Sequence, residues 1–133
     1  VPESVTRTVH MCCGYPNKLD SDNYPKAENN VYDRLVDLVE FSKIQHLSIE
    51  DAHRHIDLAV LERFKTTTII LGCFDISKSR VETVNEIETR LKSALNHIDR
   101  ERLIAAPDCG LGLLPRSVAV AKMTNLCIAA GNV

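Results

Sequence analysis

Four residues with metal-binding side chains stand at or just after segments that the sequence marks as strands. His10 and Cys12 are two residues apart at the end of the first segment, so their side chains project from the same face. Glu50 closes the second segment, and Cys109 lies just beyond the fourth. Imidazole nitrogen, thiolate sulfur and carboxylate oxygen are the ligands that Zn²⁺ takes in proteins. The residue types therefore suit a zinc site in which the carboxylate, the weaker ligand, could yield to an incoming thiolate.

The same residues also have a plainer interpretation. Free cysteine is among the most buried residue types, and a histidine at a strand end often makes only ordinary polar contacts. A His-x-Cys pair with a distant Glu and Cys is also less specific than two Cys-x-x-Cys pairs. From spacing alone, a zinc site and an ordinary structural site stay open.

Ligands so far apart in the chain need elements that bring them together, and the hydrophobic pattern supplies four strand-then-helix units. It predicts strands over 5–12, 46–50, 67–74 and 102–106. It predicts helices over 29–41, 56–64, 81–98 and 117–130, the third with a capping box at Ser79 and Glu82. The run 67–74 is almost continuously apolar and β-branched, so we expect a central strand there.

Four such units predict an α/β fold with parallel strands joined by right-handed crossovers. One architecture is a small doubly wound sheet with helices on both faces. The other is half of a (β/α)8 TIM barrel, whose complete form needs about 250 residues. No Gly-x-Gly-x-x-Gly or Gly-x-x-x-x-Gly-Lys loop follows any predicted strand, so the usual phosphate-binding reason for a doubly wound sheet is missing.

Length, composition and charge exclude several classes of protein. The 133 residues, 44% hydrophobic and 26% charged, are typical of one globular domain spanning 1–133. A net charge of -2 and an aromatic content of 5% argue against nucleic acid or an anionic membrane as partner. The apolar runs are far shorter than the roughly 20 residues of a membrane span. Five cysteines without framework spacing predict a reducing, cytoplasmic setting, and the first residues show no secretory signal and look like a cut in a longer chain.

Four short strings occur in the order found near the end of cobalamin-independent methionine synthases: His-Met-Cys at 10–12, Ser-Ile-Glu at 48–50, Phe-Asp-Ile at 74–76 and Pro-Asp-Cys-Gly-Leu at 107–111. From about Val5 to Ala130 the chain resembles the carboxyl-terminal half of that family's catalytic barrel. The family and its relatives are zinc-dependent transferases that methylate or alkylate thiols, including coenzyme M. The resemblance implies that the zinc ligands are His10, Cys12, Glu50 and Cys109.

The resemblance also implies the reaction and its small-molecule partners. A thiol bound to zinc loses its proton near neutral pH and becomes a nucleophile. In the synthases that thiol is homocysteine and the methyl donor is a reduced folate, 5-methyltetrahydrofolate. We therefore expect a homocysteine-like thiol and an alkyl donor as substrates.

The chain departs from the synthase pattern after the third strand. The family has Asp-Ile-His-Ser-Pro-Arg there, whereas residues 75–80 read Asp-Ile-Ser-Lys-Ser-Arg. Ser77 thus replaces a His that assists proton handling in the synthases. Asp75 is expected to face the site as a catalytic residue, because carboxylates at strand ends of barrels commonly do so.

Other candidate side chains receive less specific interpretations. His53 and Arg54 could line the mouth of a barrel, but a solvated helix start is the favoured interpretation. Cys13 should point away from Cys12 and take no part. Cys73 and Cys127 lie in apolar runs and are expected in the core.

Substrate contacts of the family come mostly from earlier barrel strands, which this sequence lacks. We expect the natural protein to be longer, two copies to pair, or another chain to supply the missing half, since exposed sheet edges promote association. Two functional alternatives remain open. One is transfer of coenzyme M or a similar thiol to an epoxide, which would suit Ser77, and the other is a non-catalytic zinc-binding fragment.

Overall fold

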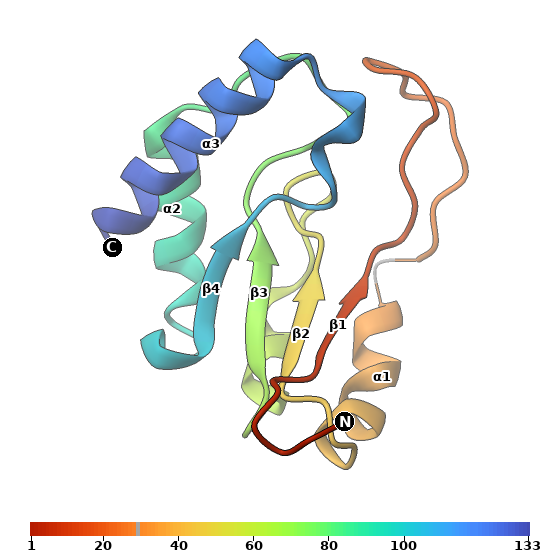
Figure 1. Cartoon of the computed structure of the whole chain (residues 1–133), viewed down its shortest axis with the longest axis vertical. Helices are drawn as coiled ribbons and strands as arrows, with labels where there is room; N and C mark the ends of the chain where they lie inside the picture. Colours follow the sequence, from red (N-terminus) through yellow and green to blue (C-terminus); the bar gives the residue numbers. More distant parts are fainter. Residues whose placement is uncertain (29) are drawn as a thin grey trace.

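Strands and helices alternate along the chain in the computed structural model, which describes residues 1–28 and 30–133 (Figure 1). The strands are β1 (Thr8–Met11), β2 (His46–Ile49), β3 (Thr68–Gly72) and β4 (Leu103–Ala106). The α-helices are α1 (Val31–Glu40), α2 (Val84–Ala94) and α3 (Arg116–Gly131). Three 3-10 helices complete the order: η1 (Leu58–Arg63), η2 (Arg100–Arg102) and η3 (Leu111–Leu113).

The four strands form one parallel sheet in the order β1-β2-β3-β4, so the predicted α/β architecture is confirmed. All four strands point the same way in Figure 1, and their carboxyl ends lie along one edge. The register places His10, Ser48, Ile70 and Ile104 side by side in one row across the sheet. Residues at the ends of separate strands can therefore meet at that edge.

Burial alternates along the central strands, and this decides between the two predicted architectures. Leu47 and Ile49 of β2 and Ile69 and Leu71 of β3 are fully buried, and they belong to a core shared with α1 and η1. The row that faces the other way is only partly buried, and Ile104 is 41% exposed. A doubly wound sheet would bury both faces. One covered face and one open face are the arrangement of half a barrel, whose open face lines the interior.

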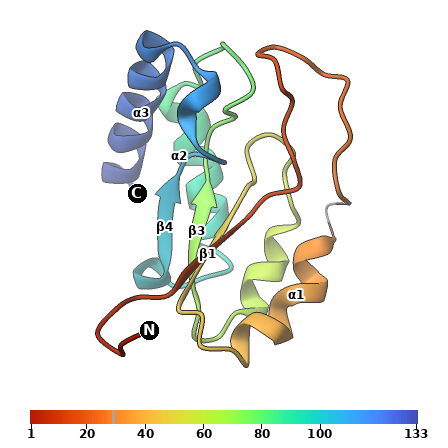
Figure 2. The ribbon, with the colours of Figure 1, turned by 45° about the vertical axis from the view of Figure 1, so that its right-hand side comes forward.

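Two clusters of apolar side chains hold the layers together. One lies between α1, η1 and the first three strands, and the other joins α2 and α3 to the β3–β4 side. Both ribbon views show α2 and α3 side by side next to β4, while α1 lies at the opposite side (Figures 1 and 2). None of the helices in the described part of the chain combines the length and apolarity needed to cross a bilayer.

Two predicted helices differ from those observed. The capping box is at Thr83 and Glu86, four residues after the predicted one, and α2 begins at Val84. Glu82 is instead buried and accepts a hydrogen bond from Lys122 Nζ at 2.8 Å, so it is not available to cap. The segment 56–64 forms the 3-10 helix η1 rather than an α-helix. The predicted first residue of α1, Asn29, lies outside the described residues.

Lys122 of α3 is fully buried and ties that helix to the segment after β3. Its Nζ donates to the Asp75 carbonyl oxygen and to Glu82 Oε2, each at 2.8 Å. The same ammonium lies 5.5 Å from the centroid of the Phe74 ring. A buried charge needs such partners, because an unpaired one would carry a large desolvation penalty. The contacts fix the backbone from which Asp75 projects.

Candidate active site

His10, Cys12 and Cys109 meet at the carboxyl edge of the sheet. Each offers one ligand atom, and these atoms all lie within 4.8 Å of one another. His10 Nε2 is 3.3 Å from Cys109 Sγ, and His10 Nδ1 is 2.9 Å from the hydroxyl oxygen of Ser48, its neighbour on β2. The Ser48 contact orients the ring, as partners of metal-binding histidines do. With zinc bonds of about 2.0–2.3 Å, one nitrogen and two sulfurs at this spacing fit a shared Zn²⁺.

Glu50, the fourth predicted ligand, is not part of this group of three. Glu50 is only 3% exposed, and its carboxylate forms a buried ion pair with Lys26. A buried carboxylate is strongly destabilising without a cation, and Lys26 is the cation that the fold supplies. The negative charge of Glu50 nevertheless acts on Cys109, a member of this group of three. The pKa of the Cys109 thiol is raised, chiefly by burial and the neighbouring Cys12, and the Glu50 charge acts in the same direction.

Asp108, immediately before Cys109, joins the second and fourth strand ends. Its Oδ1 accepts the backbone N–H groups of Asp51 and Ala52, both at 2.9 Å, and its Oδ2 accepts that of His53 at 2.7 Å. Burial raises the pKa of Asp108 to about 7, although the three N–H groups act in the opposite direction. A Cβ atom at Gly72 would lie 2.0 Å from Asp108 Oδ1, so only glycine leaves room for this carboxylate. Asp108 stands in the Pro-Asp-Cys-Gly-Leu string, but its spacing in the sequence does not indicate this role.

Asp75 and His53 form a second group, after β3 and β2. Asp75 Oδ2 lies 2.9 Å from His53 Nδ1, and Asp75 Oδ1 accepts both the N–H and the hydroxyl of Ser77 at 2.7 Å. The favoured interpretation of His53 as a solvated helix start is wrong, because its side chain is only 18% exposed. Arg54 is also partly buried and donates to the Ala27 carbonyl. The sequence signal for His53 is the replacement of the family's histidine by Ser77, which leaves the proton-handling role at this position open to another histidine.

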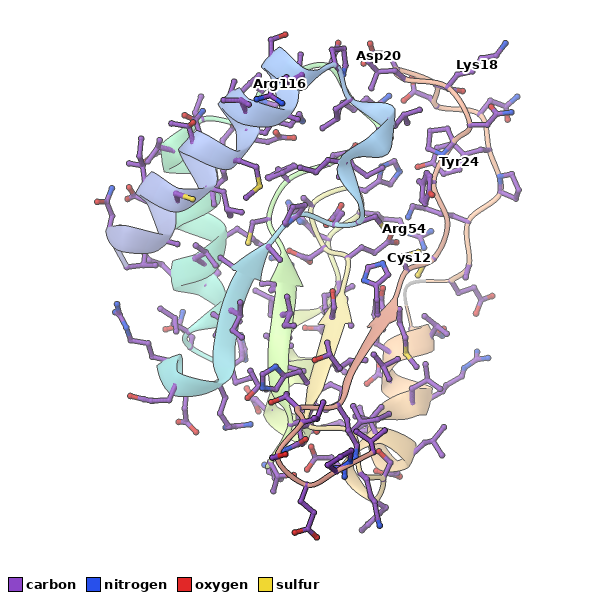
Figure 3. All side chains as sticks on the ribbon, viewed as in Figure 1. Cys12, Lys18, Asp20, Tyr24, Arg54 and Arg116 are labelled. Atoms are coloured by element: carbon purple, nitrogen blue, oxygen red, sulfur yellow. The ribbon has the colours of Figure 1, made fainter. Side chains whose placement is uncertain are left out.

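A loop covers the carboxyl edge of the sheet, and we call residues 14–28 the covering loop. It begins at Gly14, whose φ of 105° suits glycine, and it closes where Ala27 N donates to the Cys13 carbonyl at 3.0 Å. Further along, Asp20 N donates to the Ser77 carbonyl at 2.8 Å. Figure 3 shows Tyr24 on this loop, with Cys12 and Arg54 near it at the carboxyl ends of the strands. The loop therefore connects the metal-ligand group with the Asp75 group.

The other cysteines divide between core and surface. Cys13 is buried beside Tyr32, and burial raises its pKa, whereas Cys12 is exposed. Burial likewise raises the pKa of Cys73 to about 12. The prediction that Cys127 lies in the core is wrong. It is exposed because it stands on an outward side of α3, whose buried side carries Lys122 and Leu126 instead.

Comparisons with known proteins agree with this fold. Residues 27–132 match the family model described as the catalytic domain of cobalamin-independent synthase. A methionine synthase of Methanothermobacter thermautotrophicus is 38% identical over 100 residues, covering 74% of this chain and 32% of that protein. A methionine synthase of Pyrococcus abyssi is 33% identical over 96 residues, covering 71% of this chain and 28% of that protein.

A solved structure extends the likeness of the fold to nearly the whole chain. The B12-independent methionine synthase of Shewanella sp. W3-18-1, in complex with selenomethionine, matches 97% of this chain and 38% of its own with a TM-score of 0.80 and 23% identity. The chain thus spans about a third of the length of the curated relatives that it matches. Because the family model covers most of the residues, this chain belongs to the cobalamin-independent methionine synthase family, within its catalytic domain.

Proposed function

We propose that this chain is the zinc-bearing, carboxyl-terminal half of a catalytic barrel that transfers a methyl or alkyl group to a thiol. The observation that carries the proposal is the convergence of His10, Cys12 and Cys109 within 4.8 Å at the carboxyl edge. In barrels, catalytic residues come from the ends of several strands at this edge. A purely structural zinc would more often have four fixed ligands, whereas three ligands with a fourth position open are typical of catalytic zinc.

His10, Cys12 and Cys109 would hold the ion, and Glu50 would be the exchangeable fourth ligand. Bound zinc would supply acidity, so that a substrate thiol is a thiolate at neutral pH. Asp108 would set the distance between the segments that carry Glu50 and Cys109, since it binds the backbone of residues 51–53. Ser48 would hold the imidazole ring of His10. We place Asp75 in the same site, on the side opened by the end of β3.

The proposed acceptor is homocysteine and the proposed donor is a methyl folate. The support comes from relatives, including a Listeria innocua 5-methyltetrahydropteroyltriglutamate–homocysteine methyltransferase that is 29% identical over 99 residues and of which the chain covers 13%. Addition of a coenzyme M-like thiol to an epoxide is the second candidate. Ser77 favours it, because a serine hydroxyl at that position replaces the histidine expected for a folate leaving group.

The rest of the barrel is proposed to come from a longer natural chain or from a second copy. Two surfaces support a further contact with that missing part. One is the open face of the sheet, and the other is helix α3, which exposes the apolar side chains of Val120 and Ile128. Five free cysteines support a reducing, cytoplasmic setting.

Zinc content and thiol reactivity test the proposal together. The purified chain is expected to bind one zinc per molecule and to accelerate alkylation of homocysteine by methyl iodide at neutral pH. Cys109→Ser should lower zinc occupancy and remove the acceleration. Cys13→Ser is the matched control and should change neither, because Cys13 points into the core. Equal loss in both variants, or full zinc occupancy without acceleration, would contradict the proposal.

A further inference from the structure

We propose that Tyr24, His53 and Asp75 form a proton-transfer chain that delivers a proton to the leaving atom of the alkyl donor, with Tyr24 as the residue that meets the substrate. This inference rests on the proposed function. It adds an acid to a site in which the metal ligands serve only to activate the thiol nucleophile.

The three side chains form one connected group of hydrogen-bond contacts, with His53 between Tyr24 and Asp75. A carboxylate can only accept, so Asp75 Oδ2, 2.9 Å away, fixes a proton on His53 Nδ1. The Tyr24 hydroxyl contacts the other ring nitrogen, Nε2, and lies 3.2 Å from Nδ1, which is also 3.2 Å from the Ser77 hydroxyl. The two rings lie 5.4 Å apart between centroids. Nε2 is the nearer of the two ring nitrogens to the Tyr24 oxygen, so in the doubly protonated ring it carries the proton that the phenol would take. The order of the chain is carboxylate, imidazole, phenol.

The fold holds both Asp75 and His53 in place. Ser77 donates both its N–H and its hydroxyl to Asp75 Oδ1, which leaves Oδ2 for the imidazole. The backbone N–H of His53 is bound by Asp108, the residue beside Cys109. Buried Lys122 binds the carbonyl oxygen of Asp75 itself. A structural surface histidine needs none of these supports, whereas a proton donor must be oriented to within a hydrogen-bond length.

Tyr24 comes from the covering loop, so it approaches from the solvent side of the site. It is partly buried, and burial raises the pKa of its hydroxyl, with the charge of Asp75 acting in the same direction. The phenol consequently keeps its proton at neutral pH and can pass it on only if it receives another. His53 is the group placed to give it that proton.

The proposed step needs only the thiolate and the alkyl donor as reactants. The thiolate sulfur forms a bond to the alkyl carbon, and the bond from that carbon to the leaving oxygen or nitrogen breaks with its electron pair on the leaving atom. The leaving atom takes the Tyr24 hydroxyl proton, and Tyr24 takes the Nε2 proton of His53. The imidazole ends neutral, with its remaining proton still on Nδ1 facing Asp75. Solvent then returns a proton to Nε2.

Two alkylating reagents separate proton delivery from thiol activation. Opening propylene oxide leaves an alkoxide that needs a proton, whereas methyl iodide releases iodide, which needs none. With zinc and homocysteine bound, Tyr24→Phe and His53→Asn are each expected to slow the epoxide reaction by roughly 100-fold while changing the methyl iodide reaction by less than about twofold. Tyr15→Phe and His55→Asn, which alter exposed side chains of the same types, are the matched controls and should change neither rate.

Equal slowing of both reagents in His53→Asn would show a merely structural role, and no slowing of the epoxide reaction would overturn the proton chain outright. If the wild-type chain accelerates neither reagent, the proposed function fails, and nitrogen NMR then decides the proton chain alone. The ¹⁵N spectrum of His53 should show a proton on Nδ1 in the wild type that moves to Nε2 in Asp75→Ala. A wild-type ring protonated only on Nε2 would contradict the arrangement.

Discussion

Two carboxylates at opposite ends of the sheet each bind three consecutive backbone N–H groups. Near the amino end of β3, Glu40 accepts from residues 65–67 at 3.0–3.1 Å. At the carboxyl end, Asp108 accepts from residues 51–53 at 2.7–2.9 Å. The chain thus uses one local device twice, to hold one loop against a neighbouring element.

The surroundings of the two carboxylates differ. Burial tends to raise the pKa of Glu40, but the Thr67 hydroxyl and the backbone N–H groups outweigh it, and the net pKa is lowered. Asp108 is only 2% exposed, and burial prevails there, raising its pKa. At the amino end the carboxylate of Glu40 is partly exposed, so it loses less hydration than a fully buried carboxylate. The carboxyl end has a desolvated version of the device beside Cys109, which fits the division of barrels into a stability end and a catalytic end.

Gly72→Ala should break the carboxyl-end device most severely. The new Cβ would lie 2.0 Å from Asp108 Oδ1 and 2.8 Å from its Cα, so the carboxylate and its backbone must both move. We expect a loss of about 3 kcal/mol in the free energy of unfolding together with loss of zinc binding. Urea denaturation and zinc titration measure the two effects. Unchanged zinc affinity would show that Asp108 does not position the ligands.

Asp108→Asn should weaken the device without changing its size. The amide keeps one acceptor oxygen, but its NH₂ group faces a backbone N–H, leaving a buried donor unpaired. We expect a loss of about 2 kcal/mol in the free energy of unfolding. Zinc affinity should fall roughly 10-fold, as it does when partners of metal ligands are changed. A variant that loses stability but keeps full zinc affinity would reduce Asp108 to a structural role.

Glu40→Gln is the matched change at the other end. Glu40 is partly exposed, so water can replace the lost contacts, and we expect a loss of about 1 kcal/mol in the free energy of unfolding. Zinc affinity should be unchanged, because the affected loop lies at the far edge of the sheet. A drop in zinc affinity comparable to that of Asp108→Asn would erase the distinction between the two ends.

The lowered pKa of Glu40 also predicts a small pH effect. Its hydrogen bonds stabilise the fold fully above the ordinary glutamate pKa of 4.5, and this contribution is lost as the pH falls through the lower folded-state value. Glu40→Gln should therefore lose less stability than the wild type between neutral pH and acid. Thermal unfolding midpoints of both proteins, measured from pH 7 downward, check this. Parallel curves would show that Glu40 does not contribute to acid sensitivity.

Sequence reasoning reached the parts of the molecule that follow periodic rules. The alternation of apolar residues located the strands, and parallel strand ends explain why His10 and Cys109 come together despite their separation in the chain. It also placed Asp75 at a strand end, where His53 contacts it. The predicted capping box is wrong because two successive motifs compete, and only the buried pair of Glu82 with Lys122 decides between them.

The missing parts depend on the path of the covering loop, which has no periodicity to predict it. That path brings Lys26 to Glu50 and Tyr24 to His53. Neither pair is implied by sequence spacing, because each joins an irregular loop to a residue more than 20 positions away. The loop thus accounts both for the proposed proton chain and for the one predicted ligand outside the group of three.

X-ray absorption at the zinc edge, with and without homocysteine, tests the central claim most directly. The account predicts two sulfur ligands and nitrogen or oxygen neighbours in the zinc-loaded chain, from Cys12, Cys109, His10 and Glu50. Homocysteine should add a third sulfur and remove one oxygen. A shell that stays the same when homocysteine is added, or one without two protein sulfurs, would contradict it.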